Sequence, residues 1–184
     1  PTQPAVPGER LTEQSRRGES FLADLCGEWE VAAHGAGPHA RVALLRTAPV
    51  VHAEGVLKPL MMLTRFDLSE PIGRGTQVWP WISLDDEVRA IRHVIDSDLD
   101  GLLDLPGPTR ATANDLGFAL AQRMNRPFLL RAPAWGLRLA LGPDAADALL
   151  LSDMNVVPER LEASGFTFTH PTVEDAVAAA LPAG

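Results

Sequence analysis

A histidine and a glutamate lie two residues apart near the middle of the sequence, in the segment APVVHAEG. These residues, His52 and Glu54, are candidates for a general-base pair, because a nearby carboxylate favours protonation of an imidazole ring. An exposed loop without a catalytic role is the alternative, since polar residues are common in surface loops. The pattern predicts two catalytic candidates and leaves that alternative open.

An arginine precedes this segment at the end of an apolar run. Arg46 ends VALLR within residues 41–47, and such a run is typical of a strand buried on both faces of a parallel sheet. Ligands of open α/β sheets bind at the carboxyl ends of strands, so Arg46 is a third catalytic candidate. A buried ion pair with Glu30 is the alternative, because perturbed ion pairs serve structure as well as function.

Two aspartates follow two tryptophans in GRGTQVWPWISLDDEVRAIRHVI, residues 73–95. A glycine loop that ends on an amphipathic helix is the expected rim of a pocket, which makes Asp85 a fourth catalytic candidate. Carboxylates also suit the first turn of a helix, because they complement the helix dipole. A purely structural role for Asp85 and Asp86 is therefore the alternative.

The same segment and the helix before it supply candidates for substrate binding. Trp79 and Trp81 alternate along an extended stretch, so one is expected in the core and the other in the cleft. Methionines of the helix 56–66 flank that cleft, although methionine also commonly fills cores. The predicted substrate-binding residues are Trp79, Trp81, Met61, Met62, Arg65, Arg74 and Ser83.

The composition limits the classes of partner. The 184 residues carry a formal net charge of −8, which argues against nucleic acid or an anionic membrane as the main partner. Cys26 is the single cysteine, so no disulfide framework is possible, and no ligand spacing predicts a metal site. Cys26, His93 and His170 are predicted to be structural. No apolar run approaches the roughly 20 residues that span a membrane, so a cytoplasmic protein is expected. The expected partner is a small-molecule substrate.

The elements that must position these residues follow from apolar periodicity. Residues 1–18 contain no such periodicity and are expected to form an arm or loop. Strands are predicted over 41–47 and 101–107. The predicted helices are 19–34, 56–66, one that begins at Asp85, 112–125 and, after the extended segment FLLRAP, the segments AWGLRLAL, DAADALLL, PERLEASG and TVEDAVAAAL.

The two predicted strands are too few for a stable sheet. VALLR and LLDL are apolar throughout or nearly so, and parallel strands of this kind need neighbours and cover on both faces. An open apolar edge would promote aggregation. The expected partner is a second copy in a homodimer, or an N-terminal nucleotide-binding half.

Five segments occur in an order that resembles one protein family. They are FLADLCGEWEVAA, VALLRTAPVV, GRGTQVWPWISLDDEVRAIRHVI, TANDLGFALAQRMNRP and VVPERLEASGFTFTHPTVEDAV. Together they resemble the C-terminal half of the nucleoside-diphosphate-sugar epimerase-like, or cell-division-inhibitor-related, subgroup of the extended short-chain dehydrogenase/reductase superfamily. The resemblance covers roughly residues 8–182, and the tail from about residue 125 is similar to the characteristic C-terminal domain of that subgroup.

The resemblance implies an α/β fold class. The expected fold is a partial Rossmann-like parallel sheet, containing C-terminal strands only, with a mostly helical C-terminal substrate-binding subdomain. The expected organisation is an arm over 1–18, the C-terminal part of a Rossmann-like epimerase domain with pocket-rim loops over 19–110, and a small helical domain over 111–184.

The nucleotide-binding features of the family are missing from this sequence. The resemblance implies NAD(P) only where an N-terminal half carries G-x-G-x-x-G between a strand and a helix. The glycines of GAGPHA follow a predicted helix and precede a strand, which is the wrong order. Phe21 and Leu25 occupy the Tyr-x-x-x-Lys spacing of the family, and Ser83 stands where the family often has histidine. No cofactor is expected in this chain by itself.

Three functions stay open at this point. The first is the substrate-binding half of an epimerase- or dehydratase-like oxidoreductase that does not bind NAD(P) by itself. The second is a cofactor-independent isomerase, cyclase or lyase that uses acid and base residues in the same pocket. The third is a non-catalytic binding or subunit protein.

Overall fold

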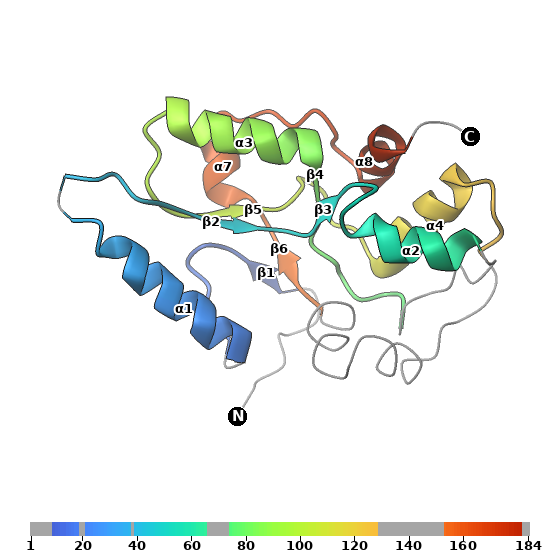
Figure 1. Ribbon diagram of the computed structural model, residues 1–184, viewed down its shortest axis with the longest axis horizontal. Helices are drawn as coiled ribbons and strands as arrows, with labels where there is room; N and C mark the ends of the chain where they lie inside the picture. The colour runs from blue at the N-terminus through green and yellow to red at the C-terminus, as the bar shows by residue number, and fades with distance from the viewer. Residues whose placement is uncertain (1–8, 19–20, 38, 66–73, 129–152, 182–184) are drawn as a thin grey trace.

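The computed structural model describes residues 9–18, 21–37, 39–65, 74–128 and 153–181, which form an α/β fold with short parallel sheets (Figure 1). None of the described helices is long and apolar enough to cross a membrane. The elements are β1 Arg10–Leu11, α1 Phe21–His34, β2 Ala43–Thr47, β3 Val50–Val51, α2 Leu57–Arg65, β4 Ile82–Ser83, α3 Leu84–Asp96, β5 Gly101–Leu105, α4 Ala113–Arg123, β6 Asn155–Val156, α7 Glu159–Ala163 and α8 Val173–Ala180.

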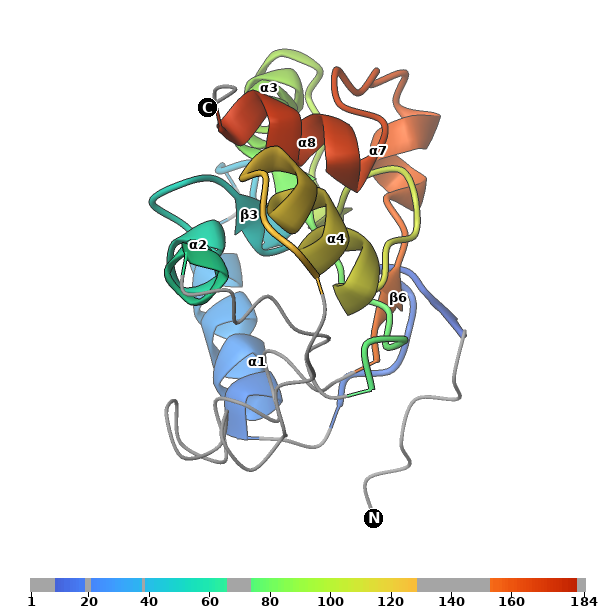
Figure 2. The ribbon, with the colours of Figure 1, turned by 90° about the vertical axis from the view of Figure 1, so that its right-hand side faces the viewer.

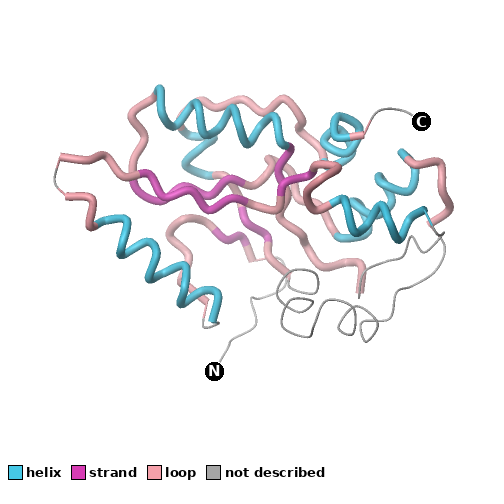
Figure 3. Tube along the Cα trace, viewed as in Figure 1, coloured by secondary structure: helices cyan, strands magenta, loops and turns pink. Residues whose placement is uncertain are grey.

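The two predicted apolar strands form the longest strand pair. β2 and β5 run parallel and lie side by side in the magenta strands of Figure 3. Their register places Arg46 opposite Asp104. Two shorter parallel pairs, β1 with β6 and β3 with β4, contribute two residues from each strand. Because β2 and β5 are parallel, their carboxyl ends lie at the same edge of their sheet.

Helices lie on both sides of this pair (Figure 1). α3 and α7 lie on one side, and α1 lies on the other. The side chains under α3 and α7 form one core cluster, which contains Ala90 and Val94 from α3, Leu103 and Leu105 from β5, and Leu161 from α7. The apolar inner face of α3 therefore covers β5, as its helical periodicity requires.

A second core cluster lies where α2, α4 and α8 meet, and Figure 2 shows α4 and α8 packed side by side. Trp79 and Trp81 belong to this cluster, and they are only 4% and 2% exposed. Both side chains therefore pack inward, and the expectation that one of them lines a substrate cleft stays a prediction. The antiparallel bridge from Val78 to Thr112 and the hydrogen bond from Trp79 N to Ala111 O hold this stretch beneath α4.

The helix boundaries agree closely with the predicted ones where the structure describes them. α4 begins with the predicted capping box, in which Thr112 and Asp115 each accept a hydrogen bond from the backbone of the other. The predicted arm contains β1, and the predicted loop after Arg46 contains β3; neither strand was expected. The segments FLLRAP, AWGLRLAL and DAADALLL lie almost wholly outside the described residues.

A candidate binding cavity at the carboxyl ends of β2 and β5

A cavity of about 340 Å³ opens where β2 and β5 end. Arg46 and Thr47 line it from β2, and Asp104 lines it from β5. The remaining walls come from the segment 11–18, from α1 and from β6. This is the edge at which open α/β sheets bind ligands, and the volume falls within the range of small-molecule sites.

Arg46 forms the ion pair with Glu30 that the sequence offered as an alternative, and its catalytic role stays a prediction. Its Nε donates a hydrogen bond to Glu30 Oε1 at 2.8 Å, and its Nη2 donates to Glu30 Oε2 at 3.2 Å. This two-point contact raises the pKa of the Arg46 guanidinium above its ordinary value. The side chain lines the cavity as well, so Glu30 orients a cation that a ligand can reach.

Asp104 is the cavity residue that sequence reasoning missed. It is 4% exposed, and its carboxyl group accepts no hydrogen bond from the described residues. Burial, together with the nearby Glu13 carboxylate, raises its pKa from 3.8 to about 6, although Arg46 acts in the opposite direction. The only signal in the sequence was a carboxylate inside the otherwise apolar run GLLDL.

The segment that was predicted to be an arm forms a wall of this cavity. Glu13 Oε1 accepts hydrogen bonds from the backbone N of Asp104 at 3.1 Å and from the backbone N of Arg160 at 3.4 Å. Thr12 N donates to Ser15 Oγ at 2.9 Å, which tightens the turn after β1. Glu13 thereby fixes the segment across the end of β5, and it adds negative charge near Asp104.

A glycine in α1 admits an arginine to the cavity rim. A Cβ atom at Gly27 would overlap Arg17 Nη1, so the glycine lets the arginine lie against α1 in this conformation. Arg17 Nη2 also donates to Asp24 Oδ1 at 3.2 Å. With Arg16, which lines the same cavity, it gives the rim a positive charge above the acidic interior.

A second buried carboxyl group lies behind Thr47. Thr47 Oγ1 donates a hydrogen bond to Glu87 Oε1 at 2.9 Å, while Glu87 Oε2 has no hydrogen-bond partner among the described residues. Burial raises the pKa of Glu87 despite that hydrogen bond. Thr47 therefore separates the cavity from a carboxyl group that is costly to ionise.

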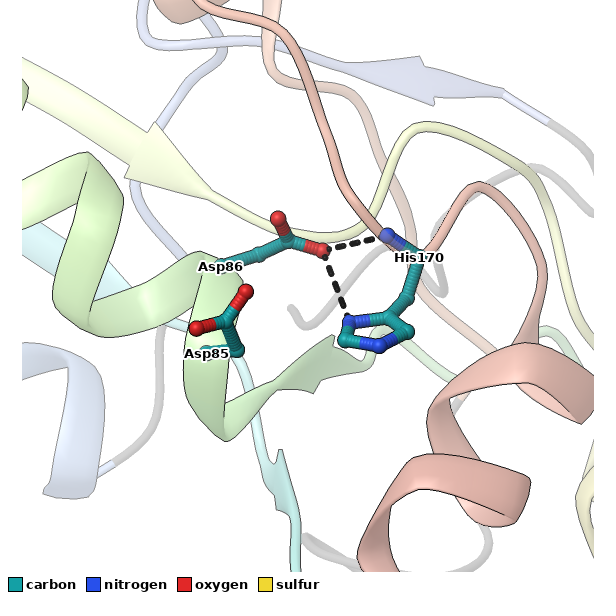
Figure 4. A group of neighbouring side chains, drawn as sticks. All are labelled: Asp85, Asp86 and His170. Carbon is teal, nitrogen blue, oxygen red and sulfur yellow. Dashed lines mark hydrogen bonds and ion pairs between the residues drawn. The ribbon is translucent and has the colours of Figure 1, made fainter.

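The start of α3 forms a polar junction away from this cavity (Figure 4). Ser83 is the helix N-cap and accepts a hydrogen bond from Asp86 N at 3.1 Å. Asp86 accepts hydrogen bonds from the backbone N of Thr169 at 2.7 Å and of His170 at 3.0 Å. Burial alone would raise the pKa of Asp86, but these backbone bonds and the Ser83 hydroxyl outweigh it and lower the pKa.

This junction agrees with the structural role predicted for His170, whose Nδ1 lies 3.0 Å from Ser83 Oγ. Asp85 is exposed in the first turn of α3, and its catalytic role stays a prediction. Ligand atoms of Asp85, Asp86 and His170 lie within 4.8 Å of one another. Since the Asp86 oxygens already accept protein hydrogen bonds, we interpret the cluster as a junction between α3 and the segment before α8.

The structure does not pair the side chains of His52 and Glu54. Glu54 Oε2 accepts a hydrogen bond from Lys58 Nζ at 2.8 Å, which lowers the pKa of this exposed carboxylate. The contact of His52 is with the backbone, because its Nδ1 accepts from Glu54 N at 3.3 Å. Neither residue lines the cavity, and their catalytic role stays a prediction.

The other predicted binding residues also lie outside the cavity walls. Met61 packs against the core cluster of the tryptophans, as a core filler would, whereas Met62 and Arg65 are exposed. Arg74 Nη2 lies 3.5 Å from Asp153 Oδ2 in an ion pair. Ser83 is buried in the junction at α3.

The chain is similar in sequence to epimerase family proteins. The chain is 41% identical over 172 residues to an epimerase family protein of Mycobacterium leprae, and the match covers 91% of this chain and 55% of that protein. It is 30% identical over 173 residues to the epimerase family protein SDR39U1 of Bos taurus, with 92% and 58% covered. The chain thus spans about half the length of the curated relatives it matches.

Solved structures agree with the sequence matches. The crystal structure of human SDR39U1 with NADPH superposes with a TM-score of 0.86 at 25% identity, covering 94% of this chain and 60% of the human chain. The nucleoside-diphosphate sugar epimerase from Corynebacterium glutamicum gives a TM-score of 0.73 at 27% identity, with 96% and 34% covered. Residues 132–180 match a domain of unknown function, DUF1731.

Proposed function

Because this chain belongs to the epimerase family of the extended short-chain dehydrogenase/reductase superfamily and carries its DUF1731 domain, we propose that it forms the substrate-binding half of an epimerase-like oxidoreductase. The observation that carries the proposal is the cavity at the carboxyl ends of β2 and β5. Its inner end holds Asp104 and Arg46, and its rim holds Arg16 and Arg17. A largely apolar cavity with Asp104 and Arg46 at the strand ends and two further arginines in its lining suits a ligand that has one hydroxylated end and one anionic end.

We propose nucleoside diphosphate sugars as the substrate class. Arginine guanidinium groups bind phosphate oxygens, so the rim is suited to a diphosphate and the interior to a sugar. The similar Corynebacterium glutamicum protein is itself named a nucleoside-diphosphate sugar epimerase, which supports the choice.

Dinucleotide binding is proposed to need a further segment. The human structure contains NADPH, but it is longer than the part that this chain matches. Within the described residues, no glycine-rich turn joins a strand to the N-terminus of a helix, and such a turn is what receives a pyrophosphate in this fold. The described residues therefore do not fit a nicotinamide dinucleotide by themselves.

Binding of UDP-glucose tests the proposal. Calorimetric titration is expected to show saturable binding to the chain, and Arg46→Ala is expected to weaken it about tenfold or more, which is about 1.4 kcal/mol. The physical reason is the loss of the cation that Glu30 holds at the cavity wall.

The matched control for this titration is Arg92→Ala, which removes an exposed arginine of α3 that pairs with Asp96. This variant should bind UDP-glucose as the unchanged chain does, and NADPH should give no saturable heat with either. Absence of UDP-glucose binding to the unchanged chain would refute the proposal, and equal losses in the two arginine variants would show that the cavity is not the site.

A cofactor-independent isomerase is the second candidate. It is favoured by Asp104, whose pKa of about 6 allows both protonation states near neutral pH. Conversion of a sugar phosphate by the chain alone, without added dinucleotide, would distinguish this candidate from the first.

We propose that the chain associates through its open sheet edge and its exposed apolar side chains, either with a nucleotide-binding half or with a second copy. Among the described residues β2 pairs only with β5, and Phe21, Trp29 and Val31 of α1 are largely exposed. Sedimentation of the chain alone should therefore show a species heavier than a monomer, with an interface above roughly 1,000 Å². A monomer that persists at high concentration would contradict this.

A further inference from the structure

We propose that the Asp104 carboxyl group is the proton-exchanging group of the cavity, where it accepts a hydrogen bond from a sugar hydroxyl and takes up its proton. This inference rests on the proposed function, because it requires a hydroxylated ligand in the cavity at the ends of β2 and β5. It adds a residue that neither the motifs of the sequence nor the comparisons single out.

The Asp104 carboxyl group is largely buried and has no hydrogen-bond partner among the described residues. Asp104 is 4% exposed and lines the cavity, yet its carboxyl oxygens accept no hydrogen bond from the described residues. Largely buried polar side chains nearly always have hydrogen-bond partners, and the Asp104 carboxyl group can find one only on the side that lines the cavity. A ligand in the cavity can supply the missing donor.

The charges around Asp104 make its end of the cavity better suited to a neutral group than to an anion. Glu13 from the segment before α1 and Glu30 from α1 place negative charge near Asp104, and Arg46 from β2 places positive charge there. From α7, Arg160 directs its guanidinium to Leu102 O and its backbone N to Glu13. A phosphate would be repelled at this end of the cavity, whereas a neutral hydroxyl would not.

Proton transfer between a sugar hydroxyl and Asp104 balances without a further reactant. The O–H bond of the sugar breaks, its proton joins an oxygen of Asp104, and the electron pair stays on the sugar oxygen. Arg46 lies close enough to Asp104 to affect its ionisation, so it is placed to stabilise that negative charge. The reverse transfer restores the hydroxyl, which makes the exchange a general acid–base step with no other reactant.

The test is the pH dependence of UDP-glucose binding in the chain and in Asp104→Asn. A hydroxyl that donates to the carboxylate favours its charged form, so binding should release a proton between pH 5 and pH 6. Calorimetry in two buffers of different ionisation enthalpy measures that release. The affinity of the unchanged chain should rise about threefold or more from pH 5 to pH 7, and Asp104→Asn should bind more weakly at pH 7 without this pH dependence.

The matched control is Asp98→Asn, which changes an exposed aspartate whose left-handed backbone, with φ of 54°, asparagine also adopts. It should keep the proton release of the unchanged chain. Failure of UDP-glucose to bind at all would refute the proposed function, whereas binding without proton release in the unchanged chain would refute only the role of Asp104.

A second measurement does not depend on folding of the variant. Carboxyl-carbon NMR of the unchanged chain should show Asp104 titrating near pH 6, the value that its burial produces. Saturating UDP-glucose should move this midpoint to lower pH, and an unmoved midpoint would overturn the inference.

Discussion

Asp86→Ala is expected to lower the free energy of unfolding by about 3–5 kcal/mol, because it removes a buried charge whose partners then lose their acceptor. Asp86 is 1% exposed, and it accepts hydrogen bonds from Ser83, Arg89, Thr169 and His170. The two backbone donors fix the segment before α8 to the start of α3. Urea denaturation followed by circular dichroism measures the loss.

The neighbouring Asp85→Ala is the control for this prediction. Asp85 is exposed in the same helical turn, so its replacement should change the stability by less than about 0.5 kcal/mol. The pKa of Asp86 is lowered in the folded state, so its contribution is present above the ordinary value of 3.8 and is lost as the pH falls through the folded-state pKa. Equal losses from both substitutions at pH 7, or a deficit of Asp86→Ala that does not shrink in acid, would contradict the junction.

Trp81→Ala is expected to cost about 3–5 kcal/mol of stability, the range for removal of a buried aromatic side chain. Its indole Nε1 donates to Thr109 O at 3.1 Å, and the six-membered part of its ring lies against Gly107. A Cβ atom at Gly107 would come within 2.8 Å of that ring, which shows how tightly the site is packed. Thermal unfolding should therefore show a marked fall in the melting temperature.

Trp29→Ala provides the comparison, because Trp29 is 65% exposed on α1. Its replacement removes the same number of atoms but creates no cavity in a core, so the melting temperature of the isolated chain should change little. If the two tryptophan variants lost equal stability, the assignment of Trp81 to the core around α4 and α8 would be wrong.

The longer elements were predictable because each spans enough residues to show a period. An apolar run predicts β2, and a capping box predicts the start of α4; both are local signals. β1, β3, β4 and β6 contain two residues each, too few to show any alternation. Their existence depends on partners elsewhere in the chain, so local sequence could not reveal them.

The candidate site was predictable only in part, for the same reason. Arg46 was found because it ends an apolar strand, and its pairing with Glu30 was foreseen from their types. Asp104 was missed because its importance comes from the register of β2 with β5, which places it opposite Arg46. Glu13 was missed because the segment that carries it showed no periodicity, although it contacts the end of β5.

The pairing of β1 with β6 has a consequence for the order of folding. Arg10 pairs with Asn155, and Glu13 contacts Arg160, so one wall of the cavity joins residues from near opposite ends of the chain. During synthesis, residues 10–13 must wait until residues 155–160 have emerged from the ribosome. Contacts of such long sequence separation form late, since the entropy of closing the loop opposes them. Both cores also contain residues that follow Arg160 in the sequence, so this wall of the cavity is expected to form late and together with the cores. A nascent chain therefore has no complete ligand cavity until that stage.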